Sequence, residues 1–353
     1  MILGEDKSKF PSGNALFINL KENKILIDTN PSEKRINSFL KNELNLSSAD
    51  ITDVILSHTH LDHGRGLAAI FEKSNAMIHA HPDTLKRCEK KARIGLYAGI
   101  QKEQIHHFEA FGSSIGFKDR SYPYNRKHPL KSNQTIQLGE ISIYTHETNA
   151  HCLHMLDYEI RNDKFDLIFS CDYDFTPVPW YGVPQRGYAV QRFKDATKEL
   201  VHRKVQSIIS SHRLNPIPLT EQQSELEKYL QTINERTKRA INMIPSRTPI
   251  KLQDISNFVY PIEKMAGAYS EDYIICAQTW DYWLLLAHLE EAWQRSKVKC
   301  IESDGDLFLE RCIEADQYLT EEVEHLLVNG WAEETLQQKM PFHLPANSVW
   351  KKL

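Results

Sequence analysis

The chain has 353 residues, of which 41% are hydrophobic and 25% are charged, a mixture typical of a soluble globular protein with room for two domains. The formal net charge of −4 gives no overall attraction to nucleic acid or to an anionic membrane surface. No apolar run is long enough to span a bilayer.

Residue usage predicts a cytoplasmic protein. The stretch Met1–Lys7 lacks the charged-then-apolar pattern of a signal peptide. The six cysteines show neither CxxC pairing nor the density of a disulfide framework; they are Cys88, Cys152, Cys171, Cys276, Cys300 and Cys312. We therefore expect reduced cysteines that are buried for packing, including Cys152 and Cys171, which stand beside candidate metal ligands.

The first regular elements are a hairpin and a helix. Residues 14–20 and 24–28 predict two strands joined by a Lys-Glu-Asn turn. Residues 32–45 carry apolar side chains at helical spacing and predict an amphipathic helix. Asp28 ends the second strand, and we interpret it as a structural residue that accepts hydrogen bonds from loop amides.

A cluster of three histidines and one aspartate follows the next predicted strand, within residues 57–64. Residues two apart in an extended segment point the same way, so His58 and His60 can bind one cation together. Asp62 and His63 come next in the chain and face a position beside the one that His58 and His60 share. Imidazole and carboxylate groups are the ligands of zinc and similar divalent ions, and this spacing predicts a metal site.

The pattern His-x-His-x-Asp-His at residues 58–63 resembles the signature of the metallo-β-lactamase superfamily, most of whose members are binuclear metal hydrolases. The family has three later ligands, and this chain offers a residue at each place. His151, in Thr-Asn-Ala-His, resembles the histidine of the family's Thr-Pro-Gly-His. Asp172 resembles the bridging aspartate that ends a strand, and His212 resembles the histidine after the final strand. The likeness covers roughly residues 10–220.

The resemblance implies a binuclear site like that of glyoxalase II. One metal would be bound by His58, His60 and His151, and the other by Asp62, His63 and His212, with Asp172 bridging them. The cofactors would be two divalent ions, expected to be zinc, with iron or manganese as alternatives. Two close cations lower the pKa of a shared water to make a hydroxide nucleophile, and Asp62 would orient that water or move its proton.

Three positions depart from the family pattern. Asn149 and Ala150 replace Pro-Gly before the third histidine, Cys171 replaces the glycine before the bridging aspartate, and Arg213 stands where glycine is common. None of these changes removes a ligand, so the prediction of metal binding is unaffected. They leave the subfamily open, and Arg213 is a candidate to bind an anionic group of the substrate, with an ion pair as the alternative.

The predicted fold is α/β, a four-layer αββα metallo-β-lactamase sandwich over residues 1–220, followed by a mostly helical domain over residues 221–353. Residues 221–243 predict one long amphipathic helix, whose apolar stripe requires a partner, either the first domain or a second copy in a homodimer. Helices predicted at residues 252–259 and 282–293, with a hairpin near residues 298–309, resemble a winged-helix appendage, through pattern rather than motif.

Three segments near the site have two interpretations each. The basic and aromatic loop at residues 111–130 is either a specificity loop over the metals or a plain surface loop. Trp180 and Tyr181, in a proline-rich stretch after Asp172, either line an acyl or aromatic subsite or pack against the core. His79 and His81 could be a second pair of metal ligands, but we favour a structural role for both.

The most consistent function is metal-dependent hydrolysis of a small-molecule ester, thioester or lactone. The alternative is a metal-dependent endoribonuclease or nucleic-acid-binding hydrolase, because winged-helix appendages and basic-aromatic loops serve RNA in other proteins. The acidic balance makes nucleic acid the less expected partner, and no membrane partner is expected.

Overall fold

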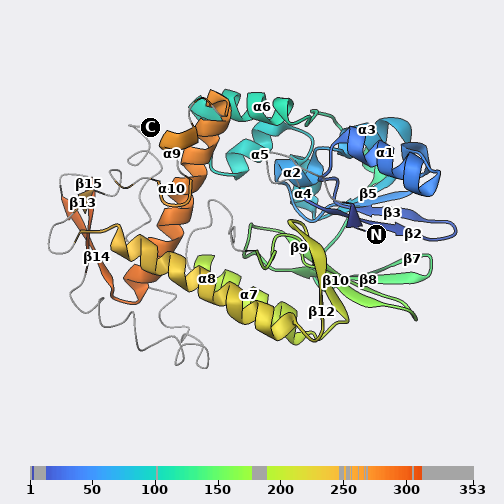
Figure 1. Ribbon diagram of the computed structural model, residues 1–353. Coiled ribbons are helices and arrows are strands. Elements are labelled where there is room, and N and C mark those ends of the chain that lie inside the picture. The colour runs from blue at the N-terminus through green and yellow to red at the C-terminus, as the bar shows by residue number, and fades with distance from the viewer. Residues whose placement is uncertain are drawn as a thin grey trace.

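The structure, a computed structural model, describes residues 2–3, 13–100, 102–176, 189–245, 250–251, 255, 257–260, 262–265, 267, 269–303 and 306–311. Two six-stranded sheets lie on one side of the molecule, opposite a small three-stranded sheet (Figure 1). The first sheet contains, in spatial order, β1 (Ile2–Leu3), β2 (Ala15–Asn19), β3 (Lys24–Ile27), β4 (Asp53–Ile55), β5 (Met77–Ala80) and β6 (Lys127–Pro129). The second contains β12 (Arg213–Pro218), β11 (Ser207–Ser210), β10 (Asp166–Phe169), β9 (Leu156–Arg161), β8 (Ile141–Glu147) and β7 (Thr135–Leu138).

Helices cover the outer faces of both sheets and form most of the C-terminal part. They are α1 (Glu33–Leu44), α2 (Leu61–Gly64), α3 (Leu67–Lys73), α4 (Pro82–Arg87), α5 (Lys91–Tyr97), α6 (Ile105–Ser114), α7 (Ala189–His202), α8 (Gln222–Asn242), α9 (Ile262–Met265) and α10 (Glu271–Gln294). Short 3₁₀ turns occur at Ser48–Asp50, Lys102–Gln104 and Tyr124–Arg126. No helix among the described residues is both long and apolar enough to span a membrane.

Strand alternation explains the layered core. Ile25, Ile27 and Ile55 belong to the hydrophobic cluster between the sheets, whereas Leu26 and Val54 belong to the cluster under α1 and α3. Adjacent side chains on a strand point to opposite faces, so apolar runs place residues in both layers. The second sheet is covered by α7 and α8, whose apolar residues join the inter-sheet cluster. This arrangement confirms the predicted αββα sandwich.

The predicted hairpin and most predicted helices are confirmed. Strands β2 and β3 pair antiparallel, with Asn19 opposite Lys24. Helix α1 begins where the Ser32 side chain accepts a hydrogen bond from the Arg35 amide, and Asn45 ends it with a left-handed φ of 54°. Helix α8 lies within one residue of each predicted bound, 221 and 243.

Two local predictions were wrong. Gly112 was expected to break regular structure, but α6 continues through it to Ser114. An added Cβ at this glycine would lie 2.7 Å from Lys91 Cδ, so its missing side chain serves the close approach of α5. A helix was expected from 252 to 259; residues 257–259 are irregular, and 252–254 and 256 lie outside the described residues. Asp281 accepts hydrogen bonds from the backbone amides of residues 258, 259 and 260 at 2.7, 2.5 and 2.9 Å. These amides are therefore not available for the backbone hydrogen bonds of a helix.

The C-terminal part consists of α8, α9, α10 and a three-stranded sheet. That sheet has the order β13 (Ile250–Lys251), β15 (Asp306–Arg311) and β14 (Val298–Ser303), which confirms the predicted hairpin. Helix α8 packs against α7, and its Tyr229 stacks on Phe175 with ring centroids 5.2 Å apart. The domain boundary at residue 220, the winged-helix likeness and the homodimer remain predictions.

A buried polar network ties α7, α8 and α10 together. Lys194 of α7 donates to Glu291 of α10 at 2.6 Å and to Asn234 of α8 at 2.6 Å. Glu291 also accepts from Thr237 and from Arg295, each at 2.5 Å. The side chains of Lys194 and Glu291 are only 6% and 4% exposed, so each charge depends on the other for compensation.

Candidate metal centre

Four of the site's side chains come from the short loop after β4. This strand is fully buried, and the chain stays extended through His60, which directly precedes α2. Extended backbone places His58 and His60 on the same side. Asp62 and His63 lie in the single turn of α2, which brings them beside the two histidines.

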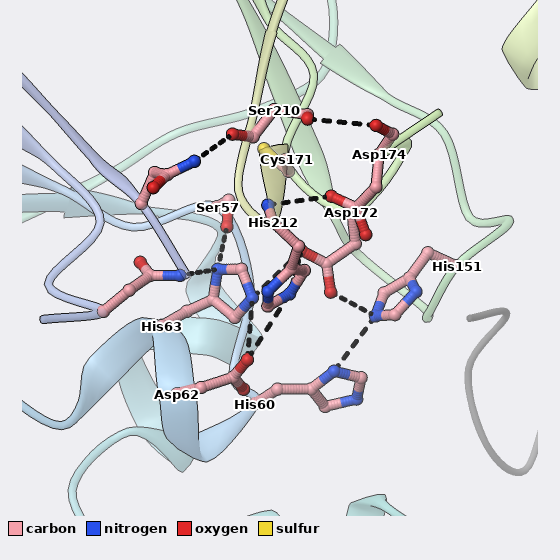
Figure 2. A network of polar contacts seen from close by, with 12 residues as sticks. Ser57, His60, Asp62, His63, His151, Cys171, Asp172, Asp174, Ser210 and His212 are labelled. Atoms are coloured by element: carbon pink, nitrogen blue, oxygen red, sulfur yellow. Dashed lines mark hydrogen bonds and ion pairs between the residues drawn. The ribbon is translucent and has the colours of Figure 1, made fainter. Parts of the chain in front are cut away.

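Three further side chains come from the second sheet. His151 follows β8, Asp172 follows β10 and His212 follows β11. The strand ends of the two sheets meet here, and all seven predicted ligands converge on one location. Figure 2 shows His60, Asp62, His63, His151, Asp172 and His212.

Asp172 divides its two carboxylate oxygens between two groups of histidines. Its Oδ2 lies 3.1 Å from His151 Nε2 and 3.7 Å from His58 Nε2. Its Oδ1 lies 3.0 Å from His63 Nε2 and 3.5 Å from His212 Nε2. The site therefore has two halves that share Asp172, as the resemblance implies.

The first half consists of three imidazoles whose ring nitrogens face one another. His60 Nδ1 lies 3.0 Å from His58 Nε2 and 3.0 Å from His151 Nε2. A neutral imidazole carries one N–H, so protons cannot satisfy every one of these facing nitrogens. A cation among them would be bound by all three lone pairs, so the residues present fit a metal ion.

The second half contains Asp62, His63 and His212. Asp62 Oδ2 lies 3.6 Å from the Nε2 atom of each of the two histidines. The Asp62 side chain is 14% exposed, compared with 5% for Asp172, so Asp62 is the more accessible carboxylate of the pair. Carboxylate and imidazole together suit a divalent cation here as well.

The two halves have opposite electrostatic character. Burial and the neighbouring imidazoles hold the pKa values of His58 and His60 well below the ordinary range. Burial also disfavours charge on His63, but Asp172, Asp62 and Asp28 outweigh it and raise the pKa of His63 well above its usual value. For His212, Asp174 and Asp172 overcome burial and raise the pKa to about 9. The second half is thus the more negative environment.

Asp28 supports the loop in the way the sequence predicted and in one further way. Its Oδ1 accepts the Ser57 amide at 2.8 Å, and its Oδ2 accepts the Ser57 hydroxyl at 2.7 Å. The same Oδ2 lies 2.8 Å from His63 Nδ1, a contact that sequence reasoning missed. A carboxylate on Nδ1 fixes the ring so that Nε2 faces the site, a common arrangement behind metal-binding histidines.

Asp174 is the other residue that sequence reasoning missed. It is fully buried, and its Oδ1 accepts the backbone amide of His212 at 3.1 Å. Burial raises the pKa of Asp174 to about 7. The available signal was a second aspartate two residues after Asp172, where an extended chain returns a side chain to the same face.

The departures from the family pattern coincide with unusual backbone. Cys171 has a φ of 53° and Asn149 has a φ of 46°, in the left-handed region that glycine adopts most easily. Cys171 and Cys152 are both buried, as expected. Cys152 offers a sulfur within 4.8 Å of ligand atoms of the three first-half histidines, and burial raises its thiol pKa.

The structure describes one of the three candidate substrate-binding residues, and the other two lie outside the described residues. Trp180 and Tyr181 lie outside the described residues, so their role remains a prediction. Arg213 makes an ion pair with Glu225 of α8 at 2.5 Å and lies 3.5 Å from the Phe175 carbonyl oxygen. Its proposed contact with substrate also remains a prediction.

His79 and His81 do not act as one pair. His79 is buried against Asp53, with 2.8 Å between Nε2 and Oδ1. His81 lies with Glu147 and His154 in a second group of potential ligands. The rings of His81 and His154 are stacked with an interplanar angle of 2°, so their in-plane lone pairs run parallel and do not converge on one ion.

The chain resembles known proteins in sequence and in fold. The family model of the metallo-beta-lactamase superfamily matches residues 9–200. Exodeoxyribonuclease WalJ of Streptococcus pneumoniae serotype 2 (strain D39) is 30% identical over 108 residues, 31% of this chain and 38% of that protein. Exodeoxyribonuclease YycJ of Bacillus anthracis is 30% identical over 79 residues, 22% of this chain and 29% of that protein. These matches span well under half the length of either relative.

A solved structure shares the fold over most of the chain. The metallo-beta-lactamase family protein TTHA1429 from Thermus thermophilus has a TM-score of 0.64 at 15% identity, and covers 88% of this chain and 98% of its own. The shared fold and the match to the family model are both consistent with a site formed where the strand ends of two sheets meet. The chain therefore belongs to the metallo-beta-lactamase superfamily.

Proposed function

We propose that this protein is a metal-dependent phosphodiesterase that hydrolyses DNA. The observation that carries the proposal is the division of the Asp172 oxygens between two sets of ligands, because this arrangement suits two cations close together. The cations, when bound, would activate a water and stabilise negative charge on the phosphoryl oxygens. His58, His60 and His151 would hold one ion, Asp62, His63 and His212 the other, and zinc is the expected metal.

Asp62 is the residue we assign to proton transfer. Its partial exposure places it at the solvent side of the site, while Asp172 and Asp28 are enclosed. A carboxylate in this position orients a water and accepts its proton. His63 and His212 both face Oδ2 of this carboxylate at 3.6 Å, which restricts its orientation.

The substrate class is supported by the curated relatives. Both relatives described above are named exodeoxyribonucleases. This support runs against the expectation, from net charge alone, that nucleic acid is not a partner. The small-molecule acyl hydrolase predicted from the sequence is the second candidate, but its expected aromatic wall, Trp180 and Tyr181, lies outside the described residues.

The basic side chains of the 111–130 segment are already engaged. Lys118 pairs with Glu33 at 3.4 Å and Arg120 with Glu72 at 2.8 Å. Arg126 lies 3.4 Å from the Phe71 ring centroid and donates to the carbonyls of residues 74 and 76. The segment is thus held against α1, α3 and the chain that follows α3.

We expect the double substitution Lys118→Ala and Arg120→Ala to change DNA cleavage by less than about twofold, because exposed ion pairs contribute little. Affinity for single-stranded DNA should fall by less than about tenfold between 50 and 200 mM salt. A protein with many phosphate contacts loses roughly 10³–10⁵-fold in affinity over the same range. Cleavage assays over a salt series check both values. A steep salt dependence that the double variant removes would show that this segment binds phosphates.

The test of the function is a substrate panel. Protein loaded with zinc or manganese would be assayed on end-labelled single- and double-stranded DNA, single-stranded RNA, a thioester and a lactone. We expect cleavage of DNA, abolished by chelator and by His60→Ala. Hydrolysis of the thioester or lactone without any phosphodiester cleavage would establish the acyl hydrolase instead.

A further inference from the structure

The histidines of the second half differ from those of the first in what lies behind their rings. The Nδ1 atom of His58 lies 3.0 Å from a neutral group, the hydroxyl of Ser57. The Nδ1 atom of His63 lies 2.8 Å from the carboxylate of Asp28. A carboxylate behind an imidazole fixes its tautomer and makes it a stronger ligand.

Asp174 contacts His212 through the backbone amide, whereas Asp28 contacts the ring of His63. Asp28 binds a loop amide with one oxygen and the ring with the other. Asp174 likewise binds the His212 amide with Oδ1, at 3.1 Å (Figure 2). The Ser210 hydroxyl donates to the Asp174 carbonyl at 3.3 Å, which fixes the backbone of this residue beside the His212 loop.

The remaining atoms of this pair lack partners. Asp174 Oδ2 and His212 Nδ1 are both buried, and neither has a hydrogen-bond partner among the described residues. One ligand atom each of Asp172, Asp174 and His212 lies within 4.8 Å of the others. A carboxylate in a buried position without a cation nearby is costly, and a cation bound in this half would compensate the charge of Asp174.

We propose that Asp174 is a positioning residue that holds the backbone of His212 in place and, together with Asp28, makes the Asp62–His63–His212 half the tighter of the two cation positions. The inference rests on the two-cation centre of the proposed function. Three carboxylates, those of Asp62, Asp28 and Asp174, act on this half in addition to the shared Asp172. Attraction between charges a few ångströms apart is strong where water is excluded, so the more negative half binds a cation first.

The experiment is a titration of metal-free protein with Zn²⁺ in competition with a chromophoric chelator. For the wild type we expect two steps of different affinity. Asp174→Asn keeps an oxygen that can accept from the His212 amide, but it removes the negative charge beside this half of the site. It should weaken the tighter step by about 10–100-fold and leave the weaker step unchanged. Asp28→Asn should weaken the same step through His63.

Two ligand variants assign the steps to the halves. His212→Ala should remove the tighter step, and His151→Ala should leave it. Asp157→Asn is the matched control, because Asp157 is equally buried but pairs with Arg203 at 2.5 Å. This control should lower the unfolding temperature without changing either zinc step, which separates a positioning role from a general effect on folding.

The outcomes are distinguishable from one another. The inference is overturned if Asp174→Asn and Asp28→Asn titrate like the wild type, or if His151→Ala removes the tighter step. Wild-type protein that binds no zinc would overturn both the two-cation centre and this inference. Wild-type protein that binds two zinc ions with the expected asymmetry but cleaves no DNA would overturn only the proposed substrate.

Discussion

Replacing Asp172 by alanine should abolish hydrolysis and leave fewer than two cations per chain. Asp172 reaches both halves of the site, with 3.1 Å from Oδ2 to His151 and 3.0 Å from Oδ1 to His63. Without it, two cations would face each other with no shared anion. Cation stabilisation of the transition state is worth several kcal/mol, so the rate should fall by at least about a thousandfold. Elemental analysis and kcat on the best substrate measure the two effects.

The matched control for this change is Asp166→Ala. Asp166 begins the same strand, β10, at the end away from the site, and its carboxylate pairs with the exposed Arg161. The control should retain its metal content and its activity within about twofold, because a surface pair contributes little. An Asp172→Ala protein with full metal content and normal activity would rule out a bridging role.

Replacing Glu291 by glutamine should destabilise the fold by about 3 kcal/mol, because it leaves the buried Lys194 ammonium without its counter-charge. Burial alone would raise the pKa of Glu291, but Lys194 and Arg295 overcome this and lower it to about 2. A shift of that size corresponds to about 3 kcal/mol. For Lys194 burial prevails and its pKa is lowered, since it has one anionic partner where Glu291 has two cationic ones. Urea unfolding followed by tryptophan fluorescence measures the change.

The pH dependence of this contribution has a definite sign. The folded pKa of Glu291 lies below its unfolded value of 4.5, so the contribution is present above pH 4.5. It is lost as the pH falls from there towards about 2. Glu291→Gln should lack this part of the acid sensitivity. The double variant Lys194→Met and Glu291→Leu should recover much of the loss, because apolar groups can replace a buried pair.

The control for this series is Glu235→Gln on α8. Glu235 pairs with Lys238 at 2.7 Å, but its side chain is 55% exposed. We expect a change within about 0.5 kcal/mol. An equal effect of Glu235→Gln and Glu291→Gln would show that burial of the network does not determine its contribution.

Much of the fold and the ligand set could be predicted from local signals. The hairpin at β2 and β3, the amphipathic helices and the four ligand motifs are each contained within a short stretch of the chain. Short-range periodicity and spacing are sufficient for such features. The likeness to a known family then supplied the long-range arrangement, which places His151, Asp172 and His212 beside the first four ligands.

The residues that sequence reasoning missed depend on contacts distant in the chain. The contact of Asp28 with the His63 ring spans 35 positions, and that of Asp174 with the His212 amide spans 38. Nothing in the spacing of either pair marks it as a contact. The irregular segment at 257–260 has the same cause, because Asp281 takes its amides from more than 20 positions away. Tertiary hydrogen bonds here override local propensity.

The candidate cation ligands are divided between the ends of two separate sheets, and this has a consequence for folding. His58 and His63 follow a strand of the first sheet, whereas Asp172 and His212 follow strands of the second, so the complete set exists only after the sheets have packed together. A cation bound by all of them is a ligand of the native state alone. By mass action it should add about 2.7 kcal/mol of apparent stability when free metal is about 100 times its dissociation constant. The lifetime of the protein in a cell would then follow the local supply of metal as well as the temperature.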